Sequence, residues 1–384
     1  MFYVLEQALN SLLTFIIGIA FVRYLGVEVY GQYAIYILIS LFFLNLFYNL
    51  VTLPCLMEVS ERRESRYLLT SIVISMLFFT LIGLASGVFN LFIGIPDYLL
   101  VPIYCHIYCV DDCVRKLMIK KNDFKLLLLR FSLVILSILP IALSPLSNVN
   151  LYFFIFPFLV ALSLIQLCYF LKYLRVKPLD LNNTLKLYRG NLGFYASAKM
   201  QWMSSNIISF FAYSLLSTAN IGAIKSAQNI ASLFSFVIIS IEPYLISKYS
   251  NMKKGKYNLA LIKLALAGSL VLLALGTTLI ALKEVIVDTL YAGNNIEIKT
   301  ALIVLAWIPL GSFLNTMVKV AARLQQRPKS LFVSSMLSTA ISIFTFYLLF
   351  DEYVLLSLPI SLLLASYVNV LIWFFLITFL KSVK

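Results

Sequence analysis

The sequence predicts an all-α, polytopic membrane protein with twelve transmembrane helices in two six-helix lobes around a central cavity. The first observation is composition: 62% of the 384 residues are hydrophobic, 12% are charged and the mean hydropathy is +0.96, which is too apolar for a soluble globule. The second is that apolar runs of about twenty residues, enough to span ~30 Å of hydrocarbon, recur from end to end. The third is that basic residues gather in alternate loops.

Twelve runs have the length of a transmembrane helix. The first is expected to stay in the mature protein, because MFYVLEQALN has no basic leader and no small-residue cleavage site follows the apolar run. The predicted spans are residues 4–24, 31–51, 67–93, 98–114, 126–145, 151–172, 192–216, 220–246, 257–282, 297–318, 331–350 and 353–379.

The basic residues set the predicted orientation. Most of the 30 Lys and Arg residues lie in the loops after the second, fourth, sixth, eighth and tenth spans and at the C-terminus. Because cytoplasmic loops carry an excess of Lys and Arg, these loops and both termini are predicted to be cytoplasmic. This orientation accounts for the net charge of +14, so the basicity does not predict nucleic-acid binding.

Several classes of function do not fit the sequence. The five cysteines lie within or at the cytoplasmic ends of predicted spans, which allows no extracellular disulfide framework. Cys105, Cys109 and Cys113 have the spacing of a packing face on a helix, so no metal site is predicted. The outer loops are short and no GxxxxGK[ST] phosphate loop is present. We therefore expect a transporter driven by an ion or substrate gradient, with no enzymatic activity and no cofactor.

Helix one has a polar face that includes Gln7 and Asn10, together with Ser11 and Thr14. Positions three and four apart lie on the same side of a helix, so these side chains share one face. Amide groups suit the hydroxyls of a sugar. Gln7 and Asn10 are therefore candidate substrate-binding residues.

Helix seven carries a stripe of aromatic and polar side chains. Its members stand at i, i+4, i+7, i+11 and i+18, which places them on one side at about 100° per residue. They are Tyr195, Lys199, Trp202, Asn206 and Tyr213. The stripe offers one cation for a phosphate, an amide for hydroxyls and aromatic faces for sugar rings. The alternative is that the stripe is packing and that the lysine extends to the cytoplasmic surface.

Helix eight carries a second polar stripe with Lys225, Gln228, Asn229 and Ser232 on one face. A charge at membrane depth costs ~3 kcal/mol unless it faces protein or water, so these groups are expected to face inward. With Lys199 nearer the inner surface and Lys225 nearer the outer one, a diphosphate can pass from one to the other. The alternative is that Lys225 extends to the outer surface.

Three acidic groups are candidates for ion coupling, namely Glu6, Asp111 and Glu242. Each has a simpler alternative. Glu6 fits a solvated helix end, Asp111 can pair with Arg115 or Lys116, and Glu242 precedes a proline that ends or kinks a helix. The sequence leaves both interpretations open for all three.

The two halves of the chain resemble each other. Gly31 and Gly222 follow short outer turns at equivalent places in helices two and eight, and PCLM at 54–57 is matched by PYLI at 243–246. Six spans in each repeat keep both halves in the same orientation, so the repeat is parallel. The predicted lobes are residues 1–178 and 179–384.

At these positions the sequence resembles a known family. RYLGVEVYGQYA at 23–34 is similar to the R-x-LG-x-x-x-YG-x-[YF]-A signature of the Wzx-type polysaccharide flippases of the multidrug/oligosaccharidyl-lipid/polysaccharide (MOP) exporter superfamily. IGAIKSAQNIASLF at 221–234 resembles the G-x-[YF]-x-x-A-x-x-[IL] pattern of helix eight in that family. With the twelve spans and the repeat, the resemblance covers essentially the whole chain.

The resemblance implies a function. Such flippases move oligosaccharide repeat units of O-antigen or capsule, linked to undecaprenyl pyrophosphate, from the cytoplasmic to the outer leaflet of the bacterial inner membrane by alternating access. It implies membrane lipids as partners and a polysaccharide polymerase and chain-length complex as a further candidate partner.

Two other functions stay open as alternatives. A lipid II flippase generally has several arginines in its first lobe, whereas helices one to four here hold only Arg23 before Arg115. A MATE-like drug or cation exporter is expected to have buried carboxylates, whereas helix one has no Asp and helix seven has no acidic residue.

Overall fold

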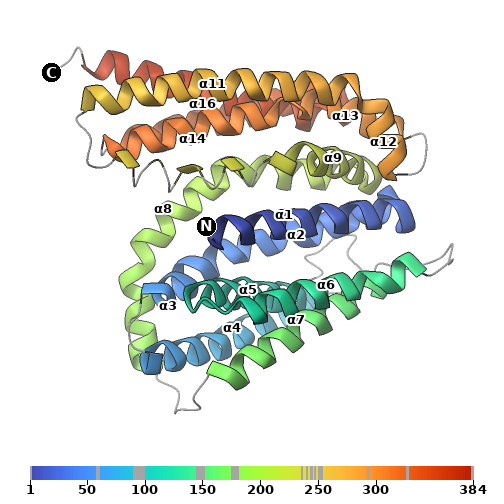
Figure 1. Ribbon diagram of the computed structural model, residues 1–384, viewed down its shortest axis with the longest axis vertical. Coiled ribbons are helices and arrows are strands. Elements are labelled where there is room, and N and C mark those ends of the chain that lie inside the picture. Colours follow the sequence, from blue (N-terminus) through green and yellow to red (C-terminus); the bar gives the residue numbers. More distant parts are fainter. Residues whose placement is uncertain are drawn as a thin grey trace. The chain divides into compact units, whose positions relative to one another are not determined.

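The computed structural model describes a helical chain (Figure 1). Every regular element in the described residues is a helix, so the all-α fold class is confirmed. The described residues are 2–57, 61–89, 100–143, 152–173, 181–234, 254–291, 295–325 and 328–381, with seven further positions between 237 and 249.

The chain folds as two compact units, one of residues 33–202 and one of residues 1–32 with 203–384. Helices α2 (Val27–Phe47) and α8 (Leu181–Leu215) each run from one unit into the other. The unit of 33–202 also contains η2 (Tyr48–Thr52), α3 (Leu53–Met57), α4 (Glu61–Phe89), α5 (Leu100–Lys120), α6 (Phe124–Leu143) and α7 (Tyr152–Tyr173).

The second unit joins the first helix to the C-terminal half of the chain, because α1 packs against α9. The boundaries of the compact units therefore differ from residue 178. The division into two lobes at residue 178, which rests on the sequence repeat, stays a prediction. The elements of this unit are α1 (Phe2–Ala20), η1 (Phe21–Leu25), α9 (Thr218–Ala231), η3 (Ser232–Phe234), α11 (Lys254–Ala281), α12 (Lys283–Tyr291), α13 (Ile296–Leu305), α14 (Ile308–Leu324), α15 (Pro328–Phe350) and α16 (Val354–Lys381).

A helix overlaps each of the twelve predicted spans. Eight segments within the described residues are long and apolar enough to cross a membrane: Glu6–Leu25, Val27–Leu56, Arg63–Gly83, Phe154–Tyr173, Leu259–Ala281, Ile296–Leu324, Phe332–Phe350 and Val354–Phe375. At the other four predicted spans, α5 carries charges in its second half, α9 has 14 residues, and part of the side chains of α6 and α8 lies outside those that the structure describes. The chain is therefore a multi-pass membrane protein.

Two features of the C-terminal half were not predicted. Residues 283–299 were expected to form a loop, but they contain the short helix α12. Its Val287 and Tyr291 are buried, and Lys299 pairs with its Glu284 at 2.6 Å and its Asp288 at 2.9 Å. The predicted span 297–318 is divided into α13 and α14, because Pro309 begins a new helix instead of continuing the old one.

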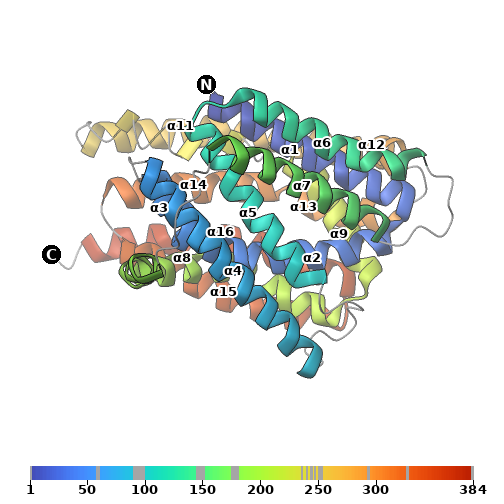
Figure 2. The same cartoon turned by 90° about the horizontal axis from the view of Figure 1, so that it is seen from below.

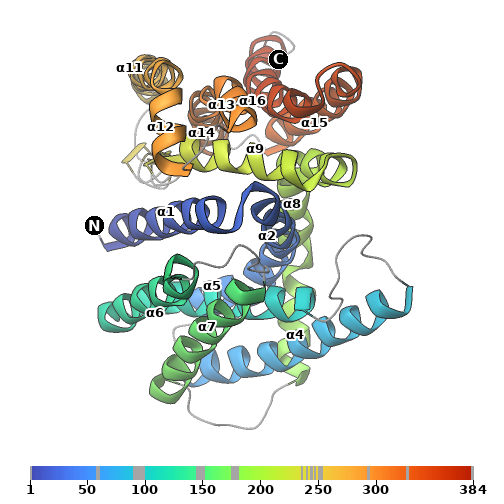
Figure 3. The ribbon, with the colours of Figure 1, turned by 90° about the vertical axis from the view of Figure 1, so that its right-hand side faces the viewer.

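Each unit has its own core. In the unit of 33–202, α5 packs on α4, α6 and α7 (Figure 2), and Cys105, Cys109 and Cys113 lie buried along it as a packing face requires. In the other unit, α14 packs on α11 and α16 (Figure 3), with Phe313 and Trp373 in their shared core. The apolar interiors of the two units are thus built from different helices.

The chain departs from regular α-helix after α2. The next residues form the π-helical turn η2, which ends two residues before Pro54. A proline has no backbone N–H, so Pro54 cannot make the hydrogen bond that a helix would form with the Leu50 carbonyl. The hydroxyl of Tyr67 on α4 donates to that carbonyl and ties α4 to the turn.

The N-terminal ends of α2 and α9 cross at a pair of glycines. A Cβ atom at Gly31 would lie 1.8 Å from the carbonyl oxygen of Thr218, and one at Gly222 would lie 1.8 Å from that of Val27. Only glycine allows two helix backbones to approach this closely. The two residues that are equivalent in the sequence repeat are therefore in direct backbone contact.

We expect Gly31→Ala to destabilise the protein. The added methyl group must push α9 away from α2, and overpacking of this kind typically costs ~1–3 kcal/mol. Thermal unfolding of the purified protein in detergent should occur at lower temperature than in the wild type, and Gly222→Ala should act in the same direction. The matched control is Ala219→Ser, at an exposed position in the first turn of α9. Wild-type unfolding temperatures in both glycine variants would contradict the crossing.

A second contact fixes the turn between α5 and α6. The carboxylate of Asp123 accepts hydrogen bonds from Lys172 Nζ and from the Tyr173 hydroxyl, each at 2.6 Å, and from the backbone N–H of Leu126 at 3.3 Å. Burial alone would raise the pKa of Asp123, but the Lys172 and Tyr173 hydrogen bonds outweigh it and hold that pKa below its ordinary value. The charged form of Asp123 is thus part of the folded state.

The stabilisation by Asp123 should depend on pH in one direction. A carboxyl group whose folded pKa is depressed contributes fully above its unfolded pKa of ~3.9, and this contribution is lost as the pH falls through the folded pKa. The difference in unfolding temperature between the wild type and Asp123→Asn should therefore be largest near neutral pH and should narrow below about pH 4. A difference that stays constant down to about pH 2 would show that the charge does not contribute.

Candidate functional site

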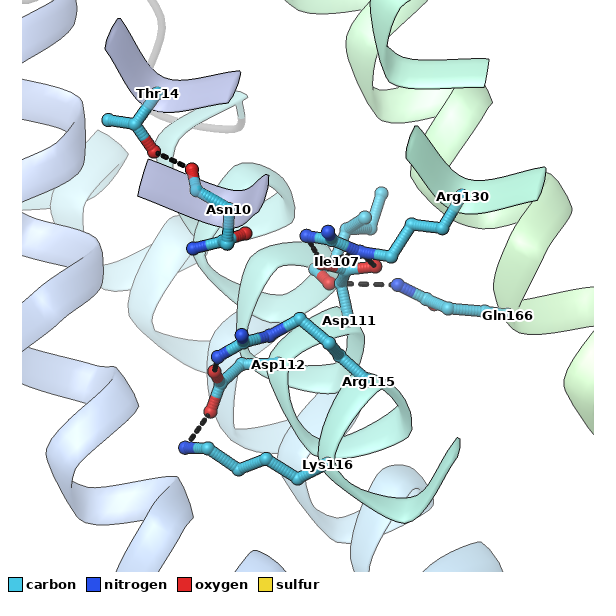
Figure 4. A network of polar contacts seen from close by, with 9 residues as sticks. All are labelled: Asn10, Thr14, Ile107, Asp111, Asp112, Arg115, Lys116, Arg130 and Gln166. Atoms are coloured by element: carbon cyan, nitrogen blue, oxygen red, sulfur yellow. Dashed lines mark hydrogen bonds and ion pairs between the residues drawn. The ribbon is translucent and has the colours of Figure 1, made fainter. Parts of the chain in front are cut away.

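A cluster of charged side chains lies within the unit of 33–202, mostly on α5 (Figure 4). Four of them are buried, and Lys116 is half-buried. We call this set the α5 cluster: Asp111, Asp112, Arg115, Lys116 and Arg130. Two carboxylates and three cations leave a net positive charge of one.

The most buried pair of the cluster joins α5 to α6. Arg130 Nε lies 3.1 Å from both carboxylate oxygens of Asp111, and Arg130 Nη2 lies 2.7 Å from Oδ2. The exposed fractions are 2% for Asp111 and 7% for Arg130. This two-pronged contact is the strong geometry for a guanidinium and a carboxylate, and it compensates two charges that would be costly to bury alone.

The pairing of Asp111 corrects one sequence expectation. Arg115 and Lys116 were the expected partners, but Asp111 pairs with Arg130 of α6. A signal for this was present, because Arg130 is an isolated charge inside an apolar run and such a residue needs a partner. Spacing along α5 could not reveal a partner on another helix.

The neighbouring Asp112 forms ion pairs with two cations of its own helix. Its carboxylate accepts from Arg115 Nη2 at 2.8 Å and from Lys116 Nζ at 2.6 Å. Lys116 Nζ also lies 4.2 Å from the ring centroid of Tyr48 in η2, within the range of a cation–π contact. The cluster thereby connects α5 to both α6 and η2.

The aromatic residues of α5 belong to the interior of the same unit. Tyr104 is fully buried, and its ring stacks at 5.9 Å on that of Tyr108. The side-chain amide of Gln166 on α7 donates to the carbonyl of Ile107 at 2.8 Å. These contacts hold α5 in place and make it the central helix of its unit.

The other unit carries polar side chains on α1 and α9, two helices that pack against each other. We call these polar side chains together the α1–α9 face. Gln7 and Asn10 of α1 and Lys225 and Gln228 of α9 are half-buried, and Ser232, just after α9, is exposed. The structure therefore brings the candidates of helix one and helix eight into the same compact unit.

Asn229 is the contact that joins the two helices. Its amide nitrogen donates to the Phe15 carbonyl at 3.0 Å, and it lies against Gly18, where a Cβ atom would come within 2.3 Å of that nitrogen. The side chain is buried. A substrate-binding role for Asn229 stays a prediction, and the contact seen here is one of helix packing.

Lys225 lies beside an aromatic ring of α8. Its Nζ atom is 5.7 Å from the ring centroid of Tyr213, as in a cation–π pair. Both side chains are half-buried. Asn206, about two helical turns before Tyr213 on α8, is half-buried as well. The ammonium group can bind an anion there, and the neighbouring ring and amides can contact sugar rings and hydroxyls.

Part of the predicted helix-seven stripe falls outside the described side chains. Tyr195, Lys199 and Trp202 lie on α8, whose backbone is helical there, but the described side chains of the stripe begin at Asn206. The proposed passage of a diphosphate from Lys199 to Lys225 therefore stays a prediction.

The remaining acidic candidates differ in their surroundings. Glu6 is 2% exposed, which does not fit the solvated helix end considered for it. Glu242 pairs with Arg323 of α14 at 2.8 Å. Among the described residues, no three His, Cys, Asp or Glu side chains are grouped to hold a metal ion. Ion coupling by Glu6, Asp111 or Glu242 remains a prediction.

The fold is similar to solved membrane transporters. The lipid II flippase MurJ in an inward closed conformation gives a TM-score of 0.71 at 16% identity, over 97% of this chain and 86% of that chain. An inward-facing multidrug resistance MATE family transporter gives 0.70 at 15% identity, over 98% of this chain and 96% of that chain. A MOP superfamily transporter from Pyrococcus furiosus gives 0.61 at 14% identity, over 99% and 95%.

This chain has the same fold as these transporters. The sequence itself matches no protein-family model and no curated protein. At identities of 14 to 16%, the similarity concerns the arrangement of helices. The side chains that meet a substrate must be argued from this chain alone.

We expect Asp111 to be required for stability as long as the charge of Arg130 is present. Asp111→Asn leaves a buried guanidinium uncompensated and should cost ~3–5 kcal/mol, whereas Asp111→Asn/Arg130→Gln removes both charges and should recover much of this loss. The measurement is thermal unfolding and the yield of monodisperse protein, with Asp351→Asn at an exposed position as the control.

The same double variant tests ion coupling. If Asp111 carries the coupling ion, the stable double variant should lose the pH or sodium dependence of transport. If transport and its ion dependence are unchanged, Asp111 has a packing role. A double variant no more stable than the single one would contradict the pairing itself.

Proposed function

We propose that the chain is a flippase for oligosaccharide repeat units linked to undecaprenyl pyrophosphate, which it moves from the cytoplasmic to the outer leaflet by alternating access. The membrane is the bacterial inner membrane, with both termini in the cytoplasm. The observation that carries the proposal is Lys225 on the polar α1–α9 face of a chain with the fold of a lipid II flippase. The Wzx-type motifs around Gly31 and Gly222 support the same function.

The physical need for such a device is clear. A diphosphate and a hydrated glycan stripped of water lose several kcal/mol for each polar group left without a partner. A cation beside an aromatic ring and flanking amides replaces part of that water. Lys225 serves the phosphates in this proposal, and Gln7, Asn10 and Gln228 serve the hydroxyls of the sugar.

A drug or cation exporter is the second candidate function. It is favoured by the MATE transporter, whose TM-score of 0.70 nearly equals that of the flippase, and by the buried carboxyl group of Glu6. Against it, Lys225 places a positive charge on the face that a cationic drug would have to approach. Transport of a cationic dye by the purified protein would favour this candidate.

The proposal is tested in proteoliposomes that contain a lipid-linked oligosaccharide with a labelled sugar. The wild type should expose the sugar at the opposite leaflet far faster than protein-free vesicles do. Lys225→Gln should lower the rate of sugar exposure about tenfold or more, because a hydrogen bond to a charged group contributes ~1.5–3 kcal/mol. Lys225→Arg should keep much of the rate, since a mobile phosphate requires charge more than shape.

The matched control is Lys263→Gln. Lys263 lies within a membrane-spanning segment, on α11, and its side chain is exposed, whereas that of Lys225 is half-buried. A full rate for Lys225→Gln would remove Lys225 from the site. A wild-type rate equal to that of protein-free vesicles would overturn the flippase function.

A further inference from the structure

The unit of 33–202 contains an apolar cavity of about 200 Å³. Its walls come from α2, η2, α4 and Tyr188 of α8, and four of the wall residues are phenylalanines: Phe43, Phe47, Phe78 and Phe79. We call it the phenylalanine cavity. None of the side chains of the α5 cluster lines it.

The walls present only apolar surface to the cavity. The ring centroids of Phe43 and Phe79 are 5.0 Å apart and those of Phe43 and Phe78 are 6.1 Å apart, in edge-to-face contacts. The hydroxyl of Ser75 contacts the Ile72 carbonyl at 2.9 Å and His106 Nδ1 at 3.3 Å, so it is engaged elsewhere. A polar ligand would find no partner here, whereas a hydrocarbon chain loses nothing on entry.

The cavity adjoins the hydrocarbon of the bilayer. Its two main walls belong to the membrane-spanning segments Val27–Leu56 and Arg63–Gly83. Phe78, which lines it, is 42% exposed, and the adjacent Met76 and Leu77 are 60% and 62% exposed. From Phe43 to Val51 the wall extends about 12 Å along the helix axis. This is enough length for part of a lipid chain to leave the bilayer and pack against the phenylalanines.

Exposed cations lie on the two helices that meet at Tyr188, one of the residues that line the cavity. The ring of Tyr188 lies 6.1 Å from the ring of Tyr67 on α4. Arg63 is one helical turn before Tyr67, Arg189 follows Tyr188 on α8, and Lys186 is one turn before Arg189. All three cations are exposed and belong to the predicted cytoplasmic loops.

We propose that the phenylalanine cavity binds part of the polyisoprenoid chain of the lipid-linked substrate, with the diphosphate beside Arg63, Lys186 and Arg189. This inference rests on the proposed function. Three exposed cations complement a diphosphate better than the single phosphate of a phospholipid. The site holds the tail at the predicted cytoplasmic side, where the substrate is taken up.

The test uses the full-length protein in nanodiscs of zwitterionic phosphatidylcholine and a photoreactive undecaprenyl diphosphate with a diazirine on its isoprenoid chain. Mass spectrometry should find the label on residues 43–51 and 74–79. An excess of plain undecaprenyl diphosphate should remove it, and phosphatidylglycerol at the same concentration should not.

Two kinds of variant make the test specific. Ile74→Trp fills the cavity and should lower labelling about tenfold, whereas Leu81→Trp, at an exposed position on the same helix, should leave it unchanged. The triple variant Arg63→Gln/Lys186→Gln/Arg189→Gln changes no apolar wall. It should weaken competition by undecaprenyl diphosphate but not by uncharged undecaprenol.

The other outcomes overturn either the inference or the proposed function. Equal competition by phosphatidylglycerol would make the cavity a general phospholipid site, and label spread evenly over exposed helices would mean that no specific site exists. If the proteoliposomes translocate sugar but the cavity is not labelled, the inference fails and the proposed function stands. If the cavity is labelled but no sugar is translocated, the proposed function fails alone.

Discussion

The compensation of charge in an apolar environment is the constraint on which this structure depends. Asp111 and Arg130 are both nearly inaccessible, and neither could remain charged there without the other. Their contact fixes α6 against α5, and Asp112 with Lys116 extends the same network to η2. The packing of the unit of 33–202 is thus arranged around a few ion pairs as much as around its apolar side chains.

The other unit depends on close backbone approach. Gly31 and Gly222 allow α2 and α9 to touch, and Gly18 leaves room for Asn229 to reach the backbone of α1. In a membrane, helices gain no hydrophobic energy by leaving lipid, so small residues and interhelical hydrogen bonds supply much of their association. Asn229, one of the candidate residues, makes one of these packing contacts, so the candidate site and the packing of this unit share a residue.

The candidate polar face and the phenylalanine cavity divide the chemistry of an amphipathic ligand between them. Lys225, with its neighbouring ring and amides, suits a charged and hydroxylated head group. The phenylalanine cavity suits a hydrocarbon chain, because its walls present only apolar surface. A protein that moves a lipid-linked sugar needs both kinds of surface, because the two parts of that ligand require opposite environments.

The sequence by itself determined the class of protein and much of its architecture. Long apolar runs place helices at all twelve predicted positions, since a membrane demands that backbone polar groups be satisfied within the segment. The repeat singled out Gly31 and Gly222, and the spacing of Cys105, Cys109 and Cys113 identified a buried face. Helical periodicity is a local property, so it can be read without knowing which helices are neighbours.

Only the tertiary structure decided the partners. Nothing in the spacing of α5 indicates that Asp111 pairs with Arg130 of α6. Nor does the sequence indicate that Glu242 pairs with Arg323 or that the Asn229 amide donates to the Phe15 carbonyl. The helix α12 and the break before Pro309 also escaped prediction, because a short amphipathic segment and a loop differ little in sequence. The physical reason is that these contacts join residues 19 to 214 positions apart, and their energy depends on distances that exist only after the helices have packed.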